Sequence, residues 1–308
     1  MTITPEKQKI LDNIGLIALD LDRTTLTRAG LTARTKECLE EAIKRGYQVV
    51  IATGRPFVAL PESLYKVRGL RYVIISNGAH IADLSTGEFI FSDYISHEAS
   101  RWCLEYTKSL GYHIEVFTEG KAFTDRERYD NCRANIGKKP GARYVARTRK
   151  PVDDTWQFWE EHIDKVENVN IIFETQEDKK RVREYLESME HIGFTVTSSM
   201  TYNLEIGGEH TSKANALKEL SDYTGIPLDR VIAFGDSPND LAMIRESGFG
   251  VAMGNALPEV KEDADYITLS NEDEGVCYAI RLLLFKEKNG VPKKKRRFFD
   301  IFRREKKQ

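Results

Sequence analysis

Two carboxylates stand close together near the amino end of the chain, where the apolar run IGLIALDLD ends in Asp20 and Asp22. Side chains at positions i and i+2 of a strand point to the same side, so both carboxylates can face one pocket. Neighbouring carboxylates repel each other, and the pKa of one of them rises unless a cation neutralises the pair. This spacing predicts either a metal site or a nucleophile beside a general acid.

A second acidic group follows another apolar run, in the stretch GDSPND at residues 235–240. Its Asp236 and Asp240 flank a turn that is expected to open a helix. Mg²⁺ prefers oxygen ligands and binds through one or two carboxylates together with substrate phosphate, and the amino end of a helix also attracts phosphate. A single Asp in such a place is commonly a turn former, but two such pairs together with Thr53 and Lys213 predict one common site.

The elements that must bring these residues together alternate between strands and helices. The apolar runs IGLIALDLD, YQVVIATGR, RYVIISNGA and RVIAFGD are typical of buried parallel strands. Helical patterns follow in SKANALKELSDYTG and in LTARTKECLEEAIKRG, where Thr32 can cap the start and Gly46 the end. The alternation predicts an α/β fold with a doubly wound parallel sheet. Ligands bind at the carboxyl ends of such strands, where Asp20, Thr53 and Asn77 stand.

The pattern changes after about residue 79, which indicates a second unit. The stretch IADLSTGEFIFSDYI predicts a hairpin that turns at residues 85–87. Other helix and strand patterns follow, and the earlier alternation resumes at about residue 202. We therefore predict a core of residues 1–80 and 205–288, an inserted α+β cap of residues 81–204, and a tail of residues 289–308.

Four motifs, spread in order from residue 16 to residue 275, resemble those of the haloacid dehalogenase superfamily and specifically of its Cof-like phosphatases. They are ALDLDRTTL, VVIATGRP, HTSKANAL and FGDSPNDLAMI. The resemblance implies Mg²⁺-dependent hydrolysis of the phosphate monoester of a small metabolite, such as a sugar phosphate, through an aspartyl-phosphate, with specificity set by the cap. A phosphomutase of the phosphomannomutase type and a non-catalytic protein that binds a phosphorylated metabolite are the alternatives.

The same resemblance assigns each role to a residue of these motifs. It implies that Asp20 is the nucleophile and that Asp22 protonates the leaving oxygen, activates water and offers its backbone carbonyl to Mg²⁺. Lys213 would offset charge on the phosphoryl group, Thr53 would hydrogen-bond that group, and Asn239 would hold Lys213 or phosphate. The expected catalytic residues are Asp20, Asp22, Thr53 and Lys213; the expected phosphate-binding residues are Thr53, Gly54, Arg55 and Asn239; and the expected metal ligands are Asp20, Asp22, Asp236 and Asp240.

Three positions depart from the family's motifs. Arg23 and Ala214 stand where glycine is frequent, and Thr25 stands where leucine is usual. Arg23 bears most on the local structure, because glycine tolerates a positive φ and arginine generally does not. We interpret this loop as ordinary, with Arg23 directed to solvent, and contact with substrate is the alternative.

Composition limits the classes of function that fit. The 308 residues carry a formal net charge of −2, so no whole-chain field favours nucleic acid. The P-loop pattern of many ATPases does not occur in the sequence. Four separated cysteines argue against a disulfide framework, and the chain shows neither a signal peptide nor an apolar run of about 20 residues. These features indicate a cytoplasmic protein.

Basic residues gather in the expected cap and in the tail. Those of the cap either face water or grip an anionic part of the substrate, in which case charge reversal of Arg143 and Arg147 raises KM. They are Arg126, Arg128, Arg133, Lys138, Lys139, Arg143, Arg147, Arg149 and Lys150.

Residues 291–308 hold nine Lys or Arg against two Asp or Glu. As a helix this tail would suit weak contact with an anionic membrane surface; a solvated tail and a nuclear import signal are the alternatives. The sequence identifies neither the substrate nor the oligomeric state.

Overall fold

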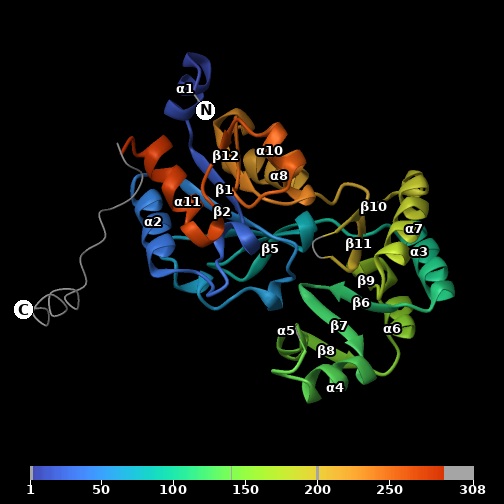
Figure 1. The fold of residues 1–308 in the computed structure, drawn as a ribbon. Helices are drawn as coiled ribbons and strands as arrows, with labels where there is room; N and C mark the ends of the chain where they lie inside the picture. The colour runs from blue at the N-terminus through green and yellow to red at the C-terminus, as the bar shows by residue number, and fades with distance from the viewer. Residues whose placement is uncertain (1–2, 140, 199–200, 288–308) are drawn as a thin grey trace, which may run out of the picture.

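Two sheets, each covered by helices, make up the part of the chain that the computed structural model describes, residues 3–139, 141–198 and 201–287 (Figure 1). The larger sheet has the strand order β14-β13-β12-β1-β2-β3-β4-β5, and the smaller sheet has the order β10-β11-β9-β6-β7-β8. The strands of the larger sheet are β1 (Leu16–Asp20), β2 (Gln48–Ala52), β3 (Tyr72–Ile75), β4 (His80–Asp83), β5 (Glu88–Ser92), β12 (Val231–Gly235), β13 (Phe249–Ala252) and β14 (Tyr266–Ile267). Those of the smaller sheet are β6 (His113–Thr118), β7 (Lys121–Asp125), β8 (Arg149–Val152), β9 (Val166–Ile172), β10 (Phe194–Thr197) and β11 (Asn203–Gly208). The helices are α1 (Pro5–Asp12), α2 (Ala33–Lys44), α3 (His97–Leu110), α4 (Arg126–Ala134), α5 (Ala142–Thr148), α6 (Thr155–Glu161), α7 (Gln176–Ser188), α8 (Lys213–Thr224), α9 (Leu241–Glu246), α10 (Pro258–Asp263) and α11 (Gly275–Ala279).

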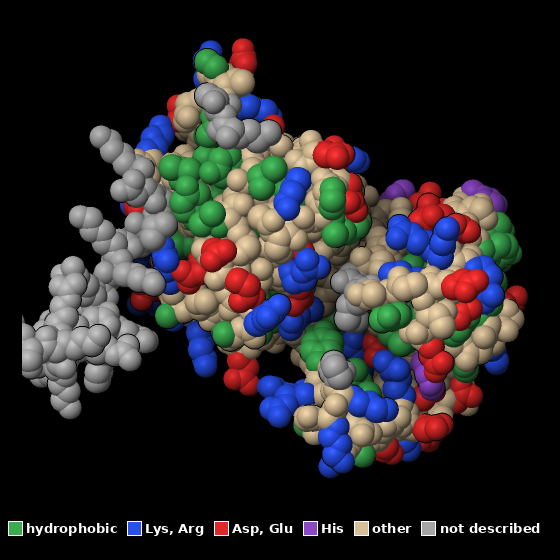
Figure 2. All heavy atoms as spheres, viewed as in Figure 1, with side chains coloured by type: hydrophobic (Ala, Val, Ile, Leu, Met, Phe, Trp, Pro, Cys, Tyr) green, Lys and Arg blue, Asp and Glu red, His purple; other side chains and the backbone are tan. Residues whose placement is uncertain are grey.

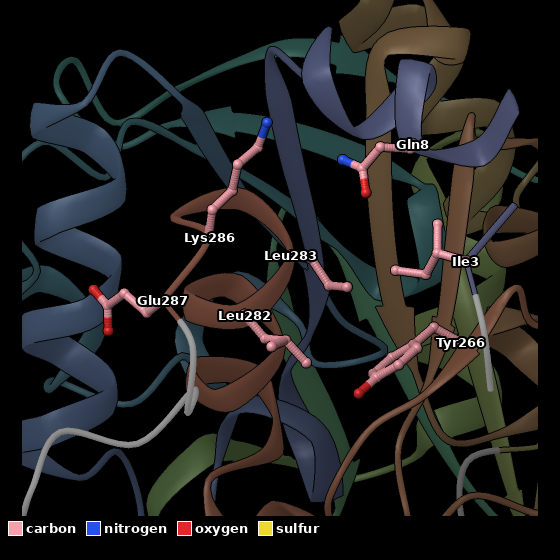
Figure 3. Close-up of a pocket in the computed structure, with 7 residues that line it drawn as sticks. All are labelled: Ile3, Gln8, Tyr266, Leu282, Leu283, Lys286 and Glu287. Atoms are coloured by element: carbon pink, nitrogen blue, oxygen red, sulfur yellow. The ribbon is translucent and has the colours of Figure 1, made fainter. Parts of the chain in front are cut away.

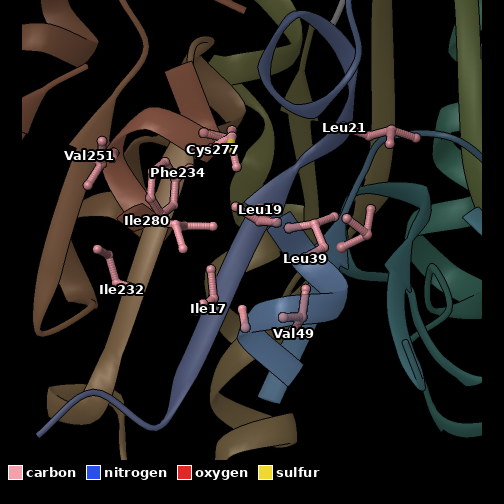
Figure 4. Close-up of a cluster of buried hydrophobic side chains, with 14 of the residues drawn as sticks. Ile17, Leu19, Leu21, Leu39, Val49, Ile232, Phe234, Val251, Cys277 and Ile280 are labelled. Carbon is pink, nitrogen blue, oxygen red and sulfur yellow. The ribbon is translucent and has the colours of Figure 1, made fainter. Parts of the chain in front are cut away.

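The larger sheet is buried on both faces. Its strands from β14 through β3 run parallel. Along β1, Ile17 and Leu19 pack on one face with residues of α2 and α11 (Figure 4), and Leu16 and Ala18 pack on the opposite face with residues of α8. Parallel sheets need such cover on both sides, which is why these strands read as continuous apolar runs. The predicted α/β fold with a doubly wound sheet is confirmed.

The hairpin of β4 and β5 extends the larger sheet instead of opening the inserted part. Its strands flank a turn at residues 84–87, as predicted, but β4 pairs antiparallel with β3. On the return, β11 pairs with β9 and β10 and so belongs to the smaller sheet. The chain therefore crosses between the sheets at residues 93–96 and 209–212, and the expected boundaries at 80 and 205 need correction. An antiparallel strand can edge a largely parallel sheet, so the change of pattern marked a change of strand direction.

The smaller sheet has one apolar and one polar face. Ile114 and Val116 of β6 point into a core formed with α3, α6 and α7. Side chains alternate along a strand, so Glu115 points the other way. It stands opposite Asn170, which in turn stands opposite Glu205, and these three form a polar row across β6, β9 and β11. This row defines the polar face of the smaller sheet, and polar side chains that could contact a ligand lie on that face.

The tail for which membrane contact was expected, residues 291–308, lies outside the described residues. Within the described ranges, no helix has both the length and the apolar character needed to cross a membrane.

Helix α2 begins at the predicted cap. The Thr32 hydroxyl accepts a hydrogen bond from the backbone N–H of Thr35 (3.0 Å) and donates to Glu274 Oε1 (2.5 Å). We expect Thr32→Ala to lower the free energy of unfolding by about 1 kcal/mol, since the first turn loses its side-chain acceptor. Urea unfolding measures this change, and Thr32→Ser should retain most of the stability. Equal stability of the Ala and Thr proteins would show that the cap contributes nothing.

Candidate active site

The carboxyl ends of three adjacent strands bring the predicted polar residues together. Asp20 ends β1, Thr53 follows β2, and Asp236 follows β12, while Lys213 opens α8. Strands β12, β1 and β2 are neighbours in parallel register, so their carboxyl ends meet at one edge of the sheet. All four residues are buried. They lie far apart along the chain, and the order of the strands together with the position of α8 makes them neighbours.

Lys213 binds two of the carboxylates directly. Its Nζ donates to Asp20 Oδ1 at 2.6 Å and to Asp240 Oδ1 at 2.7 Å. Burial alone would lower the pKa of Lys213, but the charges of Asp20 and Asp240 outweigh it and hold the pKa above its ordinary value. The ammonium therefore stays charged beside Asp20, within reach of any group bound there.

Three buried carboxylates form a cluster that fits a divalent cation. Asp20, Asp236 and Asp240 each offer an oxygen, and these oxygens lie within 4.8 Å of one another. Together with the ammonium of Lys213, the cluster has a formal charge of −2. Burial and the charge of Asp240 raise the pKa of Asp236 to about 6, and the Oδ2 atom of Asp236 is buried without a hydrogen-bond partner among the described residues. A carboxylate oxygen of this kind, in a cluster of net negative charge, has the chemistry of a ligand for a hard divalent cation.

Asp240 has a structural part in this cluster. Its Oδ2 accepts hydrogen bonds from the backbone N–H groups of Asp236 (2.9 Å) and Ser237 (3.0 Å), and its Oδ1 binds Lys213. With both oxygens engaged, Asp240 shapes the turn after β12 and leaves Asp236 and Asp20 as the carboxylates with capacity for a metal ion.

Asp22 stands just outside the cluster, in the turn at residues 21–25 that follows β1. Its carboxylate accepts hydrogen bonds from Arg55 Nε at 2.8 Å and from Arg55 Nη2 at 2.6 Å. This bidentate ion pair fixes the orientation of the Asp22 side chain. The side chain of Asp22 is 52% exposed. Arg55 also donates to the carbonyl of Ala59, and its guanidinium lies 5.4 Å from the ring of Tyr144 on α5. Asp22 is thus held at the edge of the site, open to solvent or ligand.

Arg23 does not simply point to solvent. It adopts φ +60, the left-handed conformation that glycine takes easily and arginine does not. Its side chain is 60% exposed, yet its Nε lies 3.4 Å from Asp236 Oδ2. Asn255 fixes the strained turn by donating from Nδ2 to the Arg23 carbonyl at 2.9 Å. Arg23 is thus largely exposed, as interpreted, but its loop is not ordinary, because Arg23 holds a positive φ and pairs with Asp236.

Asn239 and Gly54, two of the predicted phosphate-binding residues, lie against the side chain of Asn77. Asn239 Nδ2 donates to Asn77 Oδ1 at 3.0 Å, so Asn239 contacts Asn77 and not Lys213. A Cβ on Gly54 would lie 2.9 Å from the same Asn77 oxygen, and a glycine there lets Asn77 approach. The Thr53 hydroxyl accepts from the backbone N–H of Arg55 at 3.2 Å. Together these contacts order the loop after β2 beside the cluster.

Residues that the sequence did not single out connect the two sheets beside this site. His80 Nε2 and Glu167 Oε2 lie 2.5 Å apart, and neither side chain is exposed. Glu167 also accepts from the Ser76 hydroxyl (2.8 Å) and from the backbone N–H of Gly120 (2.9 Å). Asn77 donates to Glu205 in a second buried contact. No local motif marks such residues, because each has its partner on the other sheet.

A cavity of about 1100 Å³ opens beside the cluster, between the two sheets. We call it the cleft. From the larger sheet's side it is lined by Arg23, Ser237 and Leu257, and from the smaller sheet's side by Glu115 and Tyr144 among others. Figure 2 shows the hollow between the two parts of the molecule. A second cavity, of about 500 Å³, lies between α1, β14 and the last described helical turn (Figure 3), and none of the predicted site residues lines it.

Known proteins resemble this chain over most of its length. A family of haloacid dehalogenase-like hydrolases matches residues 17–280. The phosphatase YwpJ of Bacillus subtilis (strain 168) is 31% identical over 286 residues, which cover 87% of this chain and 99% of YwpJ. The 5-amino-6-(5-phospho-D-ribitylamino)uracil phosphatase YcsE of the same strain is 31% identical, with 87% and 95% covered. The solved structure of a haloacid dehalogenase-like hydrolase from B. subtilis aligns with a TM-score of 0.76 and 29% identity, covering 87% of this chain and 99% of that one.

Proposed function

Since this chain belongs to the haloacid dehalogenase-like hydrolases and is a phosphatase of their Cof-like branch, we propose that it hydrolyses a phosphate monoester of a small metabolite through an aspartyl-phosphate at Asp20. The observation that carries the proposal is the placement of Lys213, whose ammonium lies 2.6 Å from Asp20 in a buried cluster with a formal charge of −2. A phosphate monoester is anionic, so an anionic nucleophile can approach it only where positive charge is concentrated.

In the proposed first step, Asp20 attacks the phosphorus atom and the bond to the leaving oxygen breaks. Asp22 gives that oxygen a proton, from the position in which Arg55 holds it. Lys213 offsets the negative charge of the phosphoryl oxygens, and the Thr53 hydroxyl donates a hydrogen bond to them. In the second step Asp22 takes a proton from water, which attacks the aspartyl-phosphate and restores Asp20. Splitting the displacement in two lets one acid serve as donor and then as acceptor.

Mg²⁺ would bind at Asp20 and Asp236, with the backbone carbonyl of Asp22 as a further ligand. Bound there, it supplies positive charge to the nucleophile and the phosphoryl oxygens. The Oδ2 of Asp236 accepts no hydrogen bond from the described residues and has an ion pair with Arg23 at 3.4 Å; this oxygen and the negative balance of the cluster support the assignment. Asp240 supports the site through Lys213 and the turn at Ser237.

The smaller sheet with its helices would act as a cap that selects the leaving group, and residues 93–96 and 209–212 would join it to the catalytic core.

The free cysteines among the described residues and the metabolite substrates named for relatives such as YcsE favour a cytoplasmic enzyme. Transfer of the phosphoryl group to a sugar, as in a phosphomutase, is the alternative that product analysis separates. The relatives named as phosphatases favour water as the acceptor.

Release of inorganic phosphate from a broad panel of phosphomonoesters tests the proposal. We expect release with Mg²⁺, loss of activity after the metal is chelated, and recovery when Mg²⁺ is restored in excess. The panel should include sugar phosphates, polyol phosphates and 5-amino-6-(5-phospho-D-ribitylamino)uracil. Activity that persists undiminished after complete chelation would contradict the metal assignment, and isomerised sugar phosphate without released phosphate would favour the mutase.

A further inference from the structure

The cleft is positively charged on the side of the smaller sheet. There, five Lys or Arg side chains line it against two Glu, a surplus of three positive charges, whereas on the other side Arg23 and Glu259 balance. We call the five cations the basic wall: Arg128, Lys139, Arg149, Lys179 and Arg183. Figure 2 shows Lys and Arg side chains gathered over α4 and α5, beside the hollow. Arg143 and Arg147, the two residues chosen for charge reversal in the alternative that the cap grips an anion, do not line the cleft.

One carboxylate at the base of the basic wall is the ion-pair partner of two guanidinium groups. Arg149 donates to Glu115 Oε2 from Nε (3.0 Å) and Nη2 (2.7 Å), and both side chains are almost fully buried. Arg128 lies farther away, with its Nε 3.8 Å from Glu115 Oε1. That Nε is buried and has no hydrogen-bond partner in the described part of the chain. Two cations thus share one anion, and Arg128, which lines the cleft, is the less closely paired of the two.

We propose that the basic wall binds a second anionic group of the substrate, a carboxylate or a phosphate on the part of the molecule that leaves after hydrolysis, with Arg128 as its main contact. The inference rests on the proposed function, because it takes the scissile phosphoryl group to lie at Asp20. Charge surplus in a cavity attracts a ligand of opposite sign. A planar guanidinium matches both carboxylate and phosphate. The cleft, about 1100 Å³ in volume, has the size of a small-molecule site, and its lining reaches Arg23 and Ser237, the sequence neighbours of Asp22 and Asp236.

Matched pairs of substrates test the inference. 6-Phosphogluconate and glucitol 6-phosphate share a six-carbon chain and a phosphate, and they differ at C1, which is a carboxylate in the first and a hydroxymethyl group in the second. Fructose 1,6-bisphosphate and fructose 6-phosphate form the corresponding pair for a second phosphate. We expect the wild-type enzyme to have the higher kcat/KM for the doubly anionic member of at least one pair, and that pair identifies the group.

Substitution of Arg128 should remove this preference. In Arg128→Gln, the ratio of the two kcat/KM values is expected to fall about tenfold, the size of one lost charge-assisted hydrogen bond. A general effect on catalysis or folding cancels in this ratio. Arg133→Gln is the matched control, since Arg133 lies on the same helix, loses the same charge and does not line the cleft. Its ratio should stay at the wild-type value.

The outcomes separate this inference from the proposed function. A wild-type enzyme that favours the neutral member of both pairs would overturn the inference, as would one that hydrolyses other monoesters but none of these four. A ratio that Arg128→Gln leaves unchanged, or that Arg133→Gln lowers equally, would overturn it too. In each of these cases the phosphatase activity stands. Failure to release phosphate from any monoester would instead remove the proposed function and this inference with it.

Discussion

Asp20→Asn is expected to lower the rate of phosphate release by a factor on the order of 10⁴ or more, because it removes the atom that forms the covalent intermediate. The amide keeps an oxygen that can accept from Lys213, whose Nζ lies 2.6 Å from Asp20 Oδ1. The fold should therefore survive the loss of the charge. Initial rates at saturating substrate, with Mg²⁺ present, measure the effect, and thermal unfolding shows whether the protein remains folded.

Two further measurements make this prediction specific. Asp222→Asn makes the same change at an exposed position of α8 and should retain full activity. Rapid acid quenching followed by mass spectrometry should find a phosphoryl group on the peptide that contains Asp20 in the wild-type enzyme and none in Asp20→Asn. A folded Asp20→Asn protein with more than a tenth of wild-type activity would mean that another group attacks phosphorus.

The convergence of the site was predictable because the carboxyl ends of parallel strands meet at one edge of a sheet. Apolar runs that end in Asp20, Thr53 and Asp236 place those residues at this edge before any coordinates are known. Lys213 was grouped with them in the sequence, but its role came from the family resemblance, and the structure brings its ammonium into direct contact with Asp20. The chemical roles of these residues stay predictions until the variants are measured.

The contacts between the sheets could not be predicted in the same way. His80 and Glu167 stand 87 positions apart on strands of different sheets, and Asn77, in the turn between β3 and β4, stands 128 positions from Glu205 of β11. A polar residue in a strand carries no sign of the partner that will satisfy it. Buried polar groups are nearly always paired, so the sequence predicts only that partners exist. The chemistry at the strand ends is a local pattern, whereas the link between the sheets depends on how two separate units pack.

Arg23 shows how a departure from a motif can mislead. Arginine avoids a positive φ, so its presence gave no sign of a left-handed turn, and the loop was interpreted as ordinary. The turn instead keeps φ +60, and Asn255 and Asp236 hold the arginine in it. Strained residues persist where their surroundings over-determine them, and they collect at functional sites. The residue type alone could not reveal the positive φ of Arg23, because the contacts that offset the strain come from distant parts of the chain.

Lys213→Met is expected to lower kcat by a factor on the order of 10³ and to destabilise the fold by about 3–5 kcal/mol. The activity falls because the phosphoryl group loses the ammonium that offsets its charge in the transition state. The stability falls because Asp20, Asp236 and Asp240 remain buried with no side-chain cation directly bound to Asp20 or Asp240, which breaks a buried network and leaves one partner uncompensated. Urea unfolding and steady-state kinetics measure the two effects separately.

The two effects have separable causes, and further variants distinguish them. Lys213→Gln can still donate a hydrogen bond to Asp20, so it should recover part of the stability but little of the activity, since the amide carries no charge. Lys218→Met makes the same substitution at an exposed position of α8 and should change neither quantity appreciably. A Lys213→Met protein that is destabilised yet turns over at the wild-type rate would show that the ammonium only holds the carboxylates in place. Positive charge for the phosphoryl group would then have to come from groups other than Lys213, such as the proposed Mg²⁺.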